Sequence, residues 1–202
     1  MNDASLQRIH DFTANYFFWQ GLRWVPLGAG LLVLSLQPGK WLPFGRWGQA
    51  LAGALAITIA LALSNEIGRW YRRKFGAVRS DASLHARRDL LKWTVFYPLI
   101  VTALIVDGWW RPPILMSGIA WAAAIAAYWA STGRGRNHYV VISAVFALST
   151  FAPLMFELGS RVQRLSFIVA LIGLVYMAAG ILDHLALLRM LQGTEADDAG
   201  AV

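Results

Sequence analysis

Long apolar runs alternate with short polar connections along most of the chain. Six runs approach the roughly 20 residues that an α-helix needs to cross the hydrocarbon core of a bilayer. The pattern therefore predicts an all-α bundle of about six transmembrane helices. The first run is the least regular, because Arg23 and Pro26 interrupt its start and LQPGKWLPFG ends it with two prolines and two glycines. The six predicted spans are residues 17–36, 48–64, 90–106, 113–131, 138–158 and 165–188.

The composition agrees with a membrane protein. Hydrophobic residues make up 57% of the 202-residue chain and charged residues only 14%, and the mean hydropathy is +0.50. A soluble domain of this length needs more polar surface to cover its core. The absence of cysteine excludes disulfides, thiolate metal sites and cysteine nucleophiles.

The distribution of basic residues predicts the orientation of the helices. If the N-terminus is cytoplasmic, thirteen of the 18 Lys and Arg residues lie on the inner side and five on the outer side. Such an excess in short loops marks the cytoplasmic face. We therefore expect both termini inside, a single transmembrane domain over 1–192, a basic cytoplasmic hairpin over 65–89, and a disordered acidic tail over 193–202.

The hairpin begins with RWYRRKFGAVR, residues 69–79. The second span should continue as helix to about Phe75, with Gly76 as a stop. Each basic residue near an anionic leaflet contributes on the order of 1 kcal/mol, so lipid contact and topology account for the net charge of +7. Direct nucleic-acid binding is disfavoured, because no recognition fold accompanies the cluster. The candidate lipid- or partner-binding residues are Arg69, Trp70, Tyr71, Arg72, Arg73, Lys74, Phe75, Arg79, Arg87 and Arg88.

Small residues recur at every fourth position of the second span, where they allow another helix to approach closely. We expect this row to pack within the bundle, with a homodimer interface as the alternative. The row consists of Gly48, Ala52, Ala56, Ala60 and Ser64.

Ionisable residues inside a span are costly, so each needs a reason. Asp107 ends the third span, where we expect hydration or pairing with Arg111. Glu157 lies four residues before Arg161, a spacing typical of a helical ion pair. If Glu157 instead faces a cavity, it becomes a candidate for binding a proton or a cation.

Asp183 and His184 lie near the inner end of the last span. The leading interpretation is a structural latch, in which Asp183 accepts hydrogen bonds from an arginine of residues 69–79. A proton relay or a metal site is the alternative. A metal is disfavoured because His10, His85 and His138 lack the spacing of a ligand set, and haem is disfavoured because no two histidines face each other at mid-depth. No cofactor is therefore expected.

Motifs of known catalytic chemistry are missing from the sequence. It contains no Gly-rich phosphate loop with its nucleotide-binding framework, no His-Glu-x-x-His and no Gly-x-Ser-x-Gly. The sequence therefore gives no support for an enzyme, and a membrane-embedded enzyme is the third interpretation after the two described below.

Two stretches, RWYRRKFGAVR and GILDHLALLRML, resemble segments of small, uncharacterised bacterial polytopic membrane proteins. Those proteins carry a similar Tyr-Arg-Arg-x-Phe-Gly segment after a span and an Asp-His-Leu segment in the last span, and some are encoded beside small winged-helix regulators. The resemblance implies a bacterial membrane partner for a cytoplasmic regulator. It implies docking through Arg72, Arg73, Phe75 and the Asp183–His184 pair.

The sequence thus favours a non-enzymatic bacterial inner-membrane protein that binds or sequesters a cytoplasmic partner through the basic hairpin. The alternative is a small transporter or channel that uses Glu157 or Asp183 in a cavity of the bundle. A polar-lined cavity that reaches either carboxylate would favour the alternative.

Overall fold

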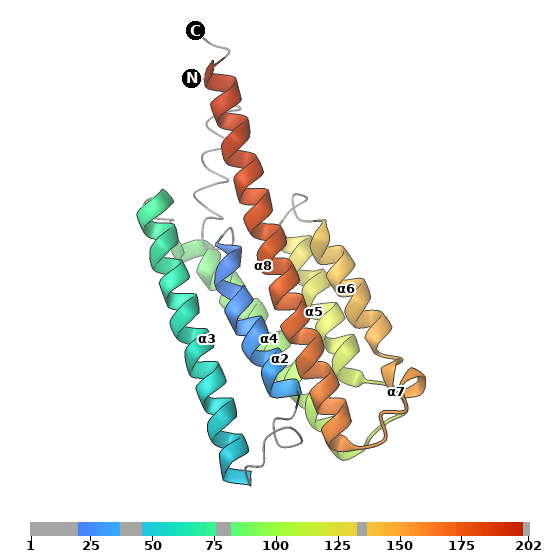
Figure 1. The fold of residues 1–202 in the computed structure, drawn as a ribbon. Coiled ribbons are helices and arrows are strands. Elements are labelled where there is room, and N and C mark those ends of the chain that lie inside the picture. The colour runs from blue at the N-terminus through green and yellow to red at the C-terminus, as the bar shows by residue number, and fades with distance from the viewer. Residues whose placement is uncertain (1–19, 37–45, 76–81, 133–136, 200–202) are drawn as a thin grey trace.

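The computed structural model describes residues 20–36, 46–75, 82–132 and 137–199, and every regular element in these ranges is helical (Figure 1). The all-α prediction is confirmed for the described part of the chain. The elements are η1 (Gly21–Arg23), α2 (Trp24–Ser35), α3 (Arg46–Phe75), α4 (Ala82–Trp109), α5 (Met116–Thr132), α6 (His138–Ser149), α7 (Ala152–Met155) and α8 (Arg161–Ala199).

Within the described ranges, two helices are long and apolar enough to cross a membrane. They are Ala50–Lys74 within α3, with 25 residues, and Arg161–Arg189 within α8, with 29 residues. The other predicted spans correspond to shorter apolar helical stretches, so the number of six crossings stays a prediction. The shorter stretches are Gly21–Ser35, Thr94–Trp109, Met116–Ala130 and His138–Ser149.

The predicted span 138–158 is not one continuous helix. Helix α6 ends at Ser149, and a separate short helix, α7, carries Pro153 in its first turn. Proline is favoured there because its missing N–H has no partner in the first turn of any helix. The carbonyl of Thr150, freed at the break, accepts the N–H of Leu115 at 2.8 Å, so the interruption leaves that group paired.

The last helix extends further than the sequence predicted. Disorder was expected from residue 193, yet α8 continues to Ala199, and only residues 200–202 of the predicted tail lie outside the described part. The continuation contains no proline, and its Ala and Glu residues favour helix.

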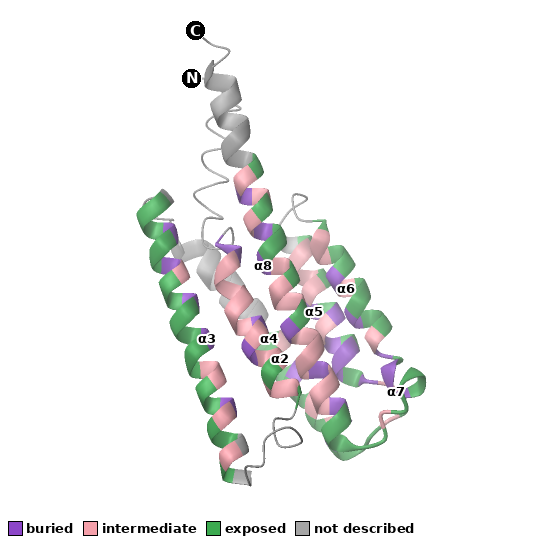
Figure 2. Ribbon diagram, in the orientation of Figure 1, coloured by how far each residue is buried: buried purple, intermediate pink, exposed green. Residues whose placement is uncertain are grey.

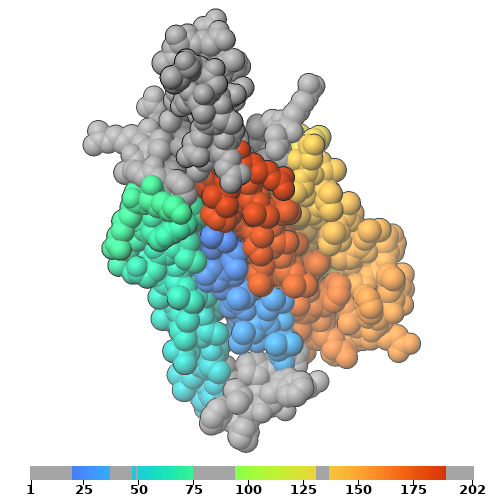
Figure 3. Space-filling view, turned by 45° about the horizontal axis from the view of Figure 1, so that its top comes forward, coloured from blue at the N-terminus to red at the C-terminus, as the bar shows by residue number. Residues whose placement is uncertain are grey.

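Helix α2 lies between α3 and α8 (Figures 1 and 3), and its contact with α8 is the most extensive in the fold. Two glycine pairs bring the backbones together. A Cβ on Gly180 would lie 2.5 Å from the carbonyl oxygen of Gly21, and one on Gly173 would lie 2.7 Å from that of Gly28. Gly21 of η1 and Gly28 of α2 are seven residues apart, as are Gly173 and Gly180 of α8. The continuous η1–α2 segment and α8 therefore touch backbone to backbone along one antiparallel line.

The small-residue row of α3 faces α2. Ala60 is 3% exposed and Ser64 is also buried, and a Cβ on Gly30 of α2 would lie 3.0 Å from the Cβ of Ala60. These contacts agree with packing inside the bundle. A homodimer, the alternative for this row, stays a prediction.

The sequence predicted that Asp107 is hydrated or pairs with Arg111. Its side chain instead caps the next helix. Its side chain is fully buried, and its two carboxylate oxygens accept the N–H groups of Met116 (2.7 Å) and Ser117 (2.8 Å) at the start of α5. Capping a helix with a carboxylate satisfies two N–H groups that have no partner within the helix. The buried Arg164 donates to the carbonyl of Pro112 at the same end of the bundle.

Many residues on the outside of the bundle are exposed (Figure 2), and a large number of them are large hydrophobic residues. Only 17% of the apolar window of α3 and 22% of that of α8 are buried inside the chain. Leu51, Leu55 and Leu63 on α3, for example, are each more than half exposed. Soluble proteins rarely leave such large apolar areas open.

Replacing Gly173 by alanine should destabilise the fold by about 1–3 kcal/mol, because the new methyl group collides with the backbone of α2 rather than with a flexible side chain. The free energy of unfolding in mixed micelles measures the effect. Gly159→Ala is the matched control, since a Cβ there meets nothing closer than 3.8 Å. Equal stability of the two variants would contradict the backbone contact.

Candidate functional site

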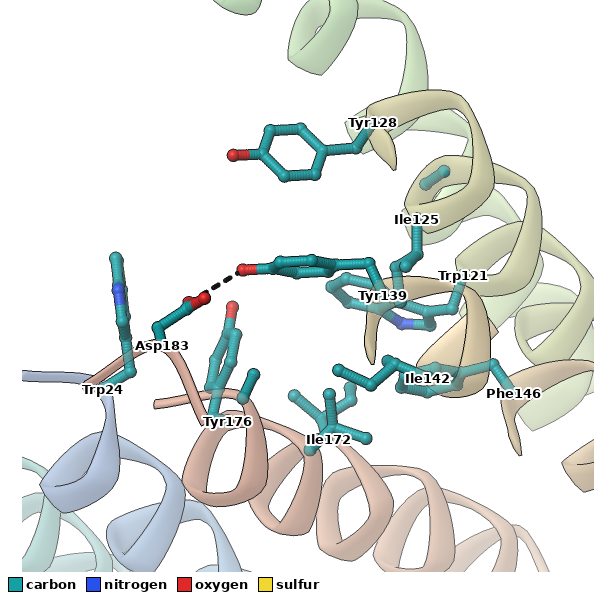
Figure 4. A pocket seen from close by; sticks show the side chains of 13 residues that line it. Trp24, Trp121, Ile125, Tyr128, Tyr139, Ile142, Phe146, Ile172, Tyr176 and Asp183 are labelled. Carbon is teal, nitrogen blue, oxygen red and sulfur yellow. Dashed lines mark hydrogen bonds between the residues drawn. The ribbon is translucent and has the colours of Figure 1, made fainter. Parts of the chain in front are cut away.

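A cavity of about 170 Å³ lies between α2, α5, α6 and α8 (Figure 4). Its wall is apolar apart from the tyrosine hydroxyls, the indole nitrogens and one carboxylate, that of Asp183. The lining residues are Trp24, Trp121, Ala124, Ile125, Tyr128, Tyr139, Ile142, Phe146, Ile172, Val175, Tyr176, Ala179 and Asp183.

Six of the lining residues are aromatic, and they form three ring pairs. The ring centroids lie 5.7 Å apart for Trp24 and Tyr176, 5.6 Å for Trp121 and Phe146, and 5.5 Å for Tyr128 and Tyr139. Such separations are those of favourable aromatic pairs. Because each ring is held by a neighbour, the wall is formed before any ligand enters.

Asp183 is the charged group of this cavity. The carboxylate is 3% exposed, and its Oδ2 accepts a hydrogen bond from the hydroxyl of Tyr139 at 3.1 Å. Oδ1 lies 3.1 Å from Nε2 of His138, in a direction that makes no hydrogen bond. A buried carboxylate oxygen without a hydrogen bond is costly, so this atom is available to a ligand.

The cavity runs along the bundle with the carboxylate at one end. Asp183 and Ile172 are eleven residues apart on α8, which corresponds to about 16 Å along a helix axis. Trp24, Tyr139 and Tyr176 surround the end with Asp183, and Trp121, Ile142, Phe146 and Ile172 surround the apolar end (Figure 4).

A second polar contact joins α3 to α8 beside the cavity. The hydroxyl of Tyr71 lies 2.6 Å from Nδ1 of His184, within hydrogen-bonding distance, and Tyr71 is fully buried. The sequence predicted such a latch, with Asp183 and an arginine as its members. Among the described residues, Asp183, one residue before His184, instead faces Tyr139 and His138 of α6. Tyr71 is consequently not available to a lipid or a partner.

The remaining charged residues at the end of α3 are exposed. Arg69 pairs with Glu66 at 2.7 Å, and Nζ of Lys74 lies 5.0 Å from the ring centroid of the exposed Trp70. Arg72 and Arg73 are likewise exposed. Arg72, Arg73 and Lys74 lie in the last turn of α3, where the helix dipole favours cations.

The side chains of four residues of the predicted basic site lie outside the described part of the structure. Arg79 lies outside the described residues. Phe75 ends α3, and Arg87 and Arg88 belong to α4, but their side chains lie outside the described part of the structure.

Glu157 takes no part in the cavity. It is exposed in the turn between α7 and α8, with a positive φ of 51°, so the predicted helical pair with Arg161 is wrong. Arg161 instead lies over the ring of Trp109, 5.6 Å from its centroid. Of the two carboxylates considered for a cavity, only Asp183 reaches one.

The sequence analysis did not predict the aromatic wall of the cavity, although the sequence contains a signal for it. Trp121 and Tyr128, Tyr139 and Phe146, and Tyr176 and Asp183 are all separated by seven residues. Seven residues are two helical turns, so each pair lies on one face. Which faces meet is decided by the packing of four helices, and single-helix periodicity does not contain that information.

Comparison of the chain with protein-family models, with curated proteins and with solved structures gives no match. The geometry of the cavity and the exposed charges therefore carries the functional argument.

Proposed function

We propose that the chain is a multi-pass protein of the bacterial inner membrane, with both termini in the cytoplasm. The exposed apolar surfaces of α3 and α8 support this proposal, because the core helix of a soluble protein would be mostly buried. The basic residues at the end of α3 support the orientation, since positive charge is retained on the cytoplasmic side.

The orientation can be tested by labelling with a membrane-impermeant maleimide, because the chain has no cysteine of its own. A Gly76→Cys variant should react only in inside-out vesicles. A Gly159→Cys variant, at the opposite end of the bundle, should react in intact cells. Labelling of Gly76→Cys from outside intact cells would overturn the orientation.

For the function, we propose that the chain binds a small ligand inside the bundle and acts as a small transporter or channel for it. One observation carries this proposal, namely the buried, incompletely hydrogen-bonded carboxylate of Asp183 in the wall of a preformed aromatic cavity. Cavities of this kind, apolar with a few placed polar groups, are typical of ligand sites. Ionisable residues kept within a membrane bundle commonly serve transport.

Filling the cavity tests this function. Ala179→Leu places three more carbon atoms against the cavity and should abolish the thermal stabilisation by whichever small aromatic probes bind the unaltered protein, together with the protein-dependent flux of the charged probe among them into liposomes. The probes are benzyltrimethylammonium, neopentylbenzene and phenylacetate. A ligand at a hundred times its Kd stabilises a protein by about 2.7 kcal/mol, which is easily measured.

The matched control is Ala178→Leu, one position along the same helix on its exposed side. It should bind the probes as the unaltered protein does. If none of the probes stabilises the unaltered protein, or if both variants respond alike, the cavity is not a ligand site for molecules of this size.

We propose, as a second candidate function, that the exposed cations at the end of α3 bind a cytoplasmic protein with an acidic surface, such as a regulator. The exposure of Arg72, Arg73 and Lys74 in one helical turn supports it. Clustered charge gives specificity and fast association more than raw affinity.

Charge reversal tests the second candidate. A variant with Arg72→Glu, Arg73→Glu and Lys74→Glu should fail to recover the partner in a pull-down from solubilised membranes. Arg111→Glu, an exposed arginine at the other end of the bundle, should recover it normally. Equal recovery by both variants would count against partner binding at this surface.

A further inference from the structure

We infer that the ligand of the cavity is an amphiphilic organic cation, with an ammonium head at Asp183 and an apolar tail toward Phe146. The inference rests on the proposed ligand-binding function and assigns its substrate class. It is carried by the combination of aromatic rings and one carboxylate at the same end of an elongated apolar cavity (Figure 4).

The head of the ligand would lie among Trp24, Tyr139 and Tyr176. Aromatic faces attract a cation through the negative potential of their π-systems, most strongly for tryptophan and in a site shielded from water. The pairing of Trp24 with Tyr176, at a tilt of 30°, and the anchoring of Tyr139 by Asp183 hold these rings in place. The cage is therefore preorganised, and little ordering accompanies binding.

The carboxylate selects the sign of the ligand charge. Asp183 supplies the one carboxylate among the lining residues, which include no Lys, Arg or His, and a carboxylate without a full set of partners is expensive at low dielectric. A bound cation supplies the missing charge to Oδ1. An anion would be repelled, and a neutral molecule would leave the carboxylate uncompensated.

A metal ion does not fit this site. Calcium and magnesium need about six oxygen ligands, and no group of three or more His, Cys, Asp or Glu side chains gathers anywhere in the described ranges. The cavity offers rings instead, which match the weakly hydrated surface of an organic ammonium group. Its apolar end, formed by Trp121, Ile142, Phe146 and Ile172, fits an apolar tail.

His138 is the described side chain that can compete with the cation. Its Nε2 lies 3.1 Å from Oδ1 of Asp183, and it carries a charge only when protonated.

Isothermal titration of the full-length protein in detergent tests the inference with three probes of similar size. They are benzyltrimethylammonium, its neutral isostere neopentylbenzene, and the anion phenylacetate. The cation should bind at least about tenfold more tightly than the other two, because only it compensates the charge of Asp183.

Three variants test which side chains bind the cation. Asp183→Asn, which keeps the shape of the side chain, should weaken cation binding at least about tenfold while leaving the neutral probe unaffected. Tyr176→Leu removes one ring of the cage and should weaken it about threefold, whereas Tyr176→Phe keeps the ring and should bind normally. Because the tyrosine variants do not alter the carboxylate, they test the cage even if Asp183→Asn does not fold.

The outcomes separate this inference from the function on which it rests. Equal binding of the cation and the neutral isostere, with loss of both in Ala179→Leu, would leave the cavity as a ligand site and overturn the cationic class. Tighter binding of phenylacetate would overturn that class as well. If no probe binds, both the cationic class and the ligand-binding function are rejected for molecules of this size.

Discussion

The direct contact between the backbones of α2 and α8 is the constraint on which the candidate site depends. In the membrane that we propose for this chain, helices gain little from the hydrophobic effect when they associate, so close van der Waals contact must hold them together. Glycines at four facing positions remove the side chains that would separate the two helices. The approach brings Trp24 against Tyr176 and leaves Gly21 beside Asp183. With a wider spacing, the cavity would lose its wall on the α2 side.

The three acidic residues singled out in the sequence differ in how their charge is compensated. Both oxygens of Asp107 are occupied by N–H groups at the start of α5, which makes it a structural residue. Glu157 is exposed in a turn, where water solvates it. Asp183 is buried, yet one of its oxygens makes no hydrogen bond. Stability alone would favour a neutral residue at this position, so its environment points to a function.

The two proposed binding surfaces meet at neighbouring positions of α8. Asp183 faces the cavity, and His184 holds Tyr71 of α3, directly before the exposed Arg72 and Arg73. Tyr71 is thus a buried packing residue, whereas the basic residues that follow it in the sequence are exposed. This arrangement explains how a short basic segment fixes the C-terminal end of α3 and presents cations at the same time.

The sequence by itself determined the helical class, the apolar surfaces and the asymmetry of charge, because these follow from composition and from periodicity along single helices. It also predicted that α3 ends near Phe75 and that its end is latched to α8. It did not predict the partners in that latch, the cap formed by Asp107, the break before Pro153 or the aromatic cavity. Only the tertiary structure decided these features. Each depends on which helix faces meet across the bundle, and a seven-residue spacing shows that two side chains share a face without showing what that face contacts.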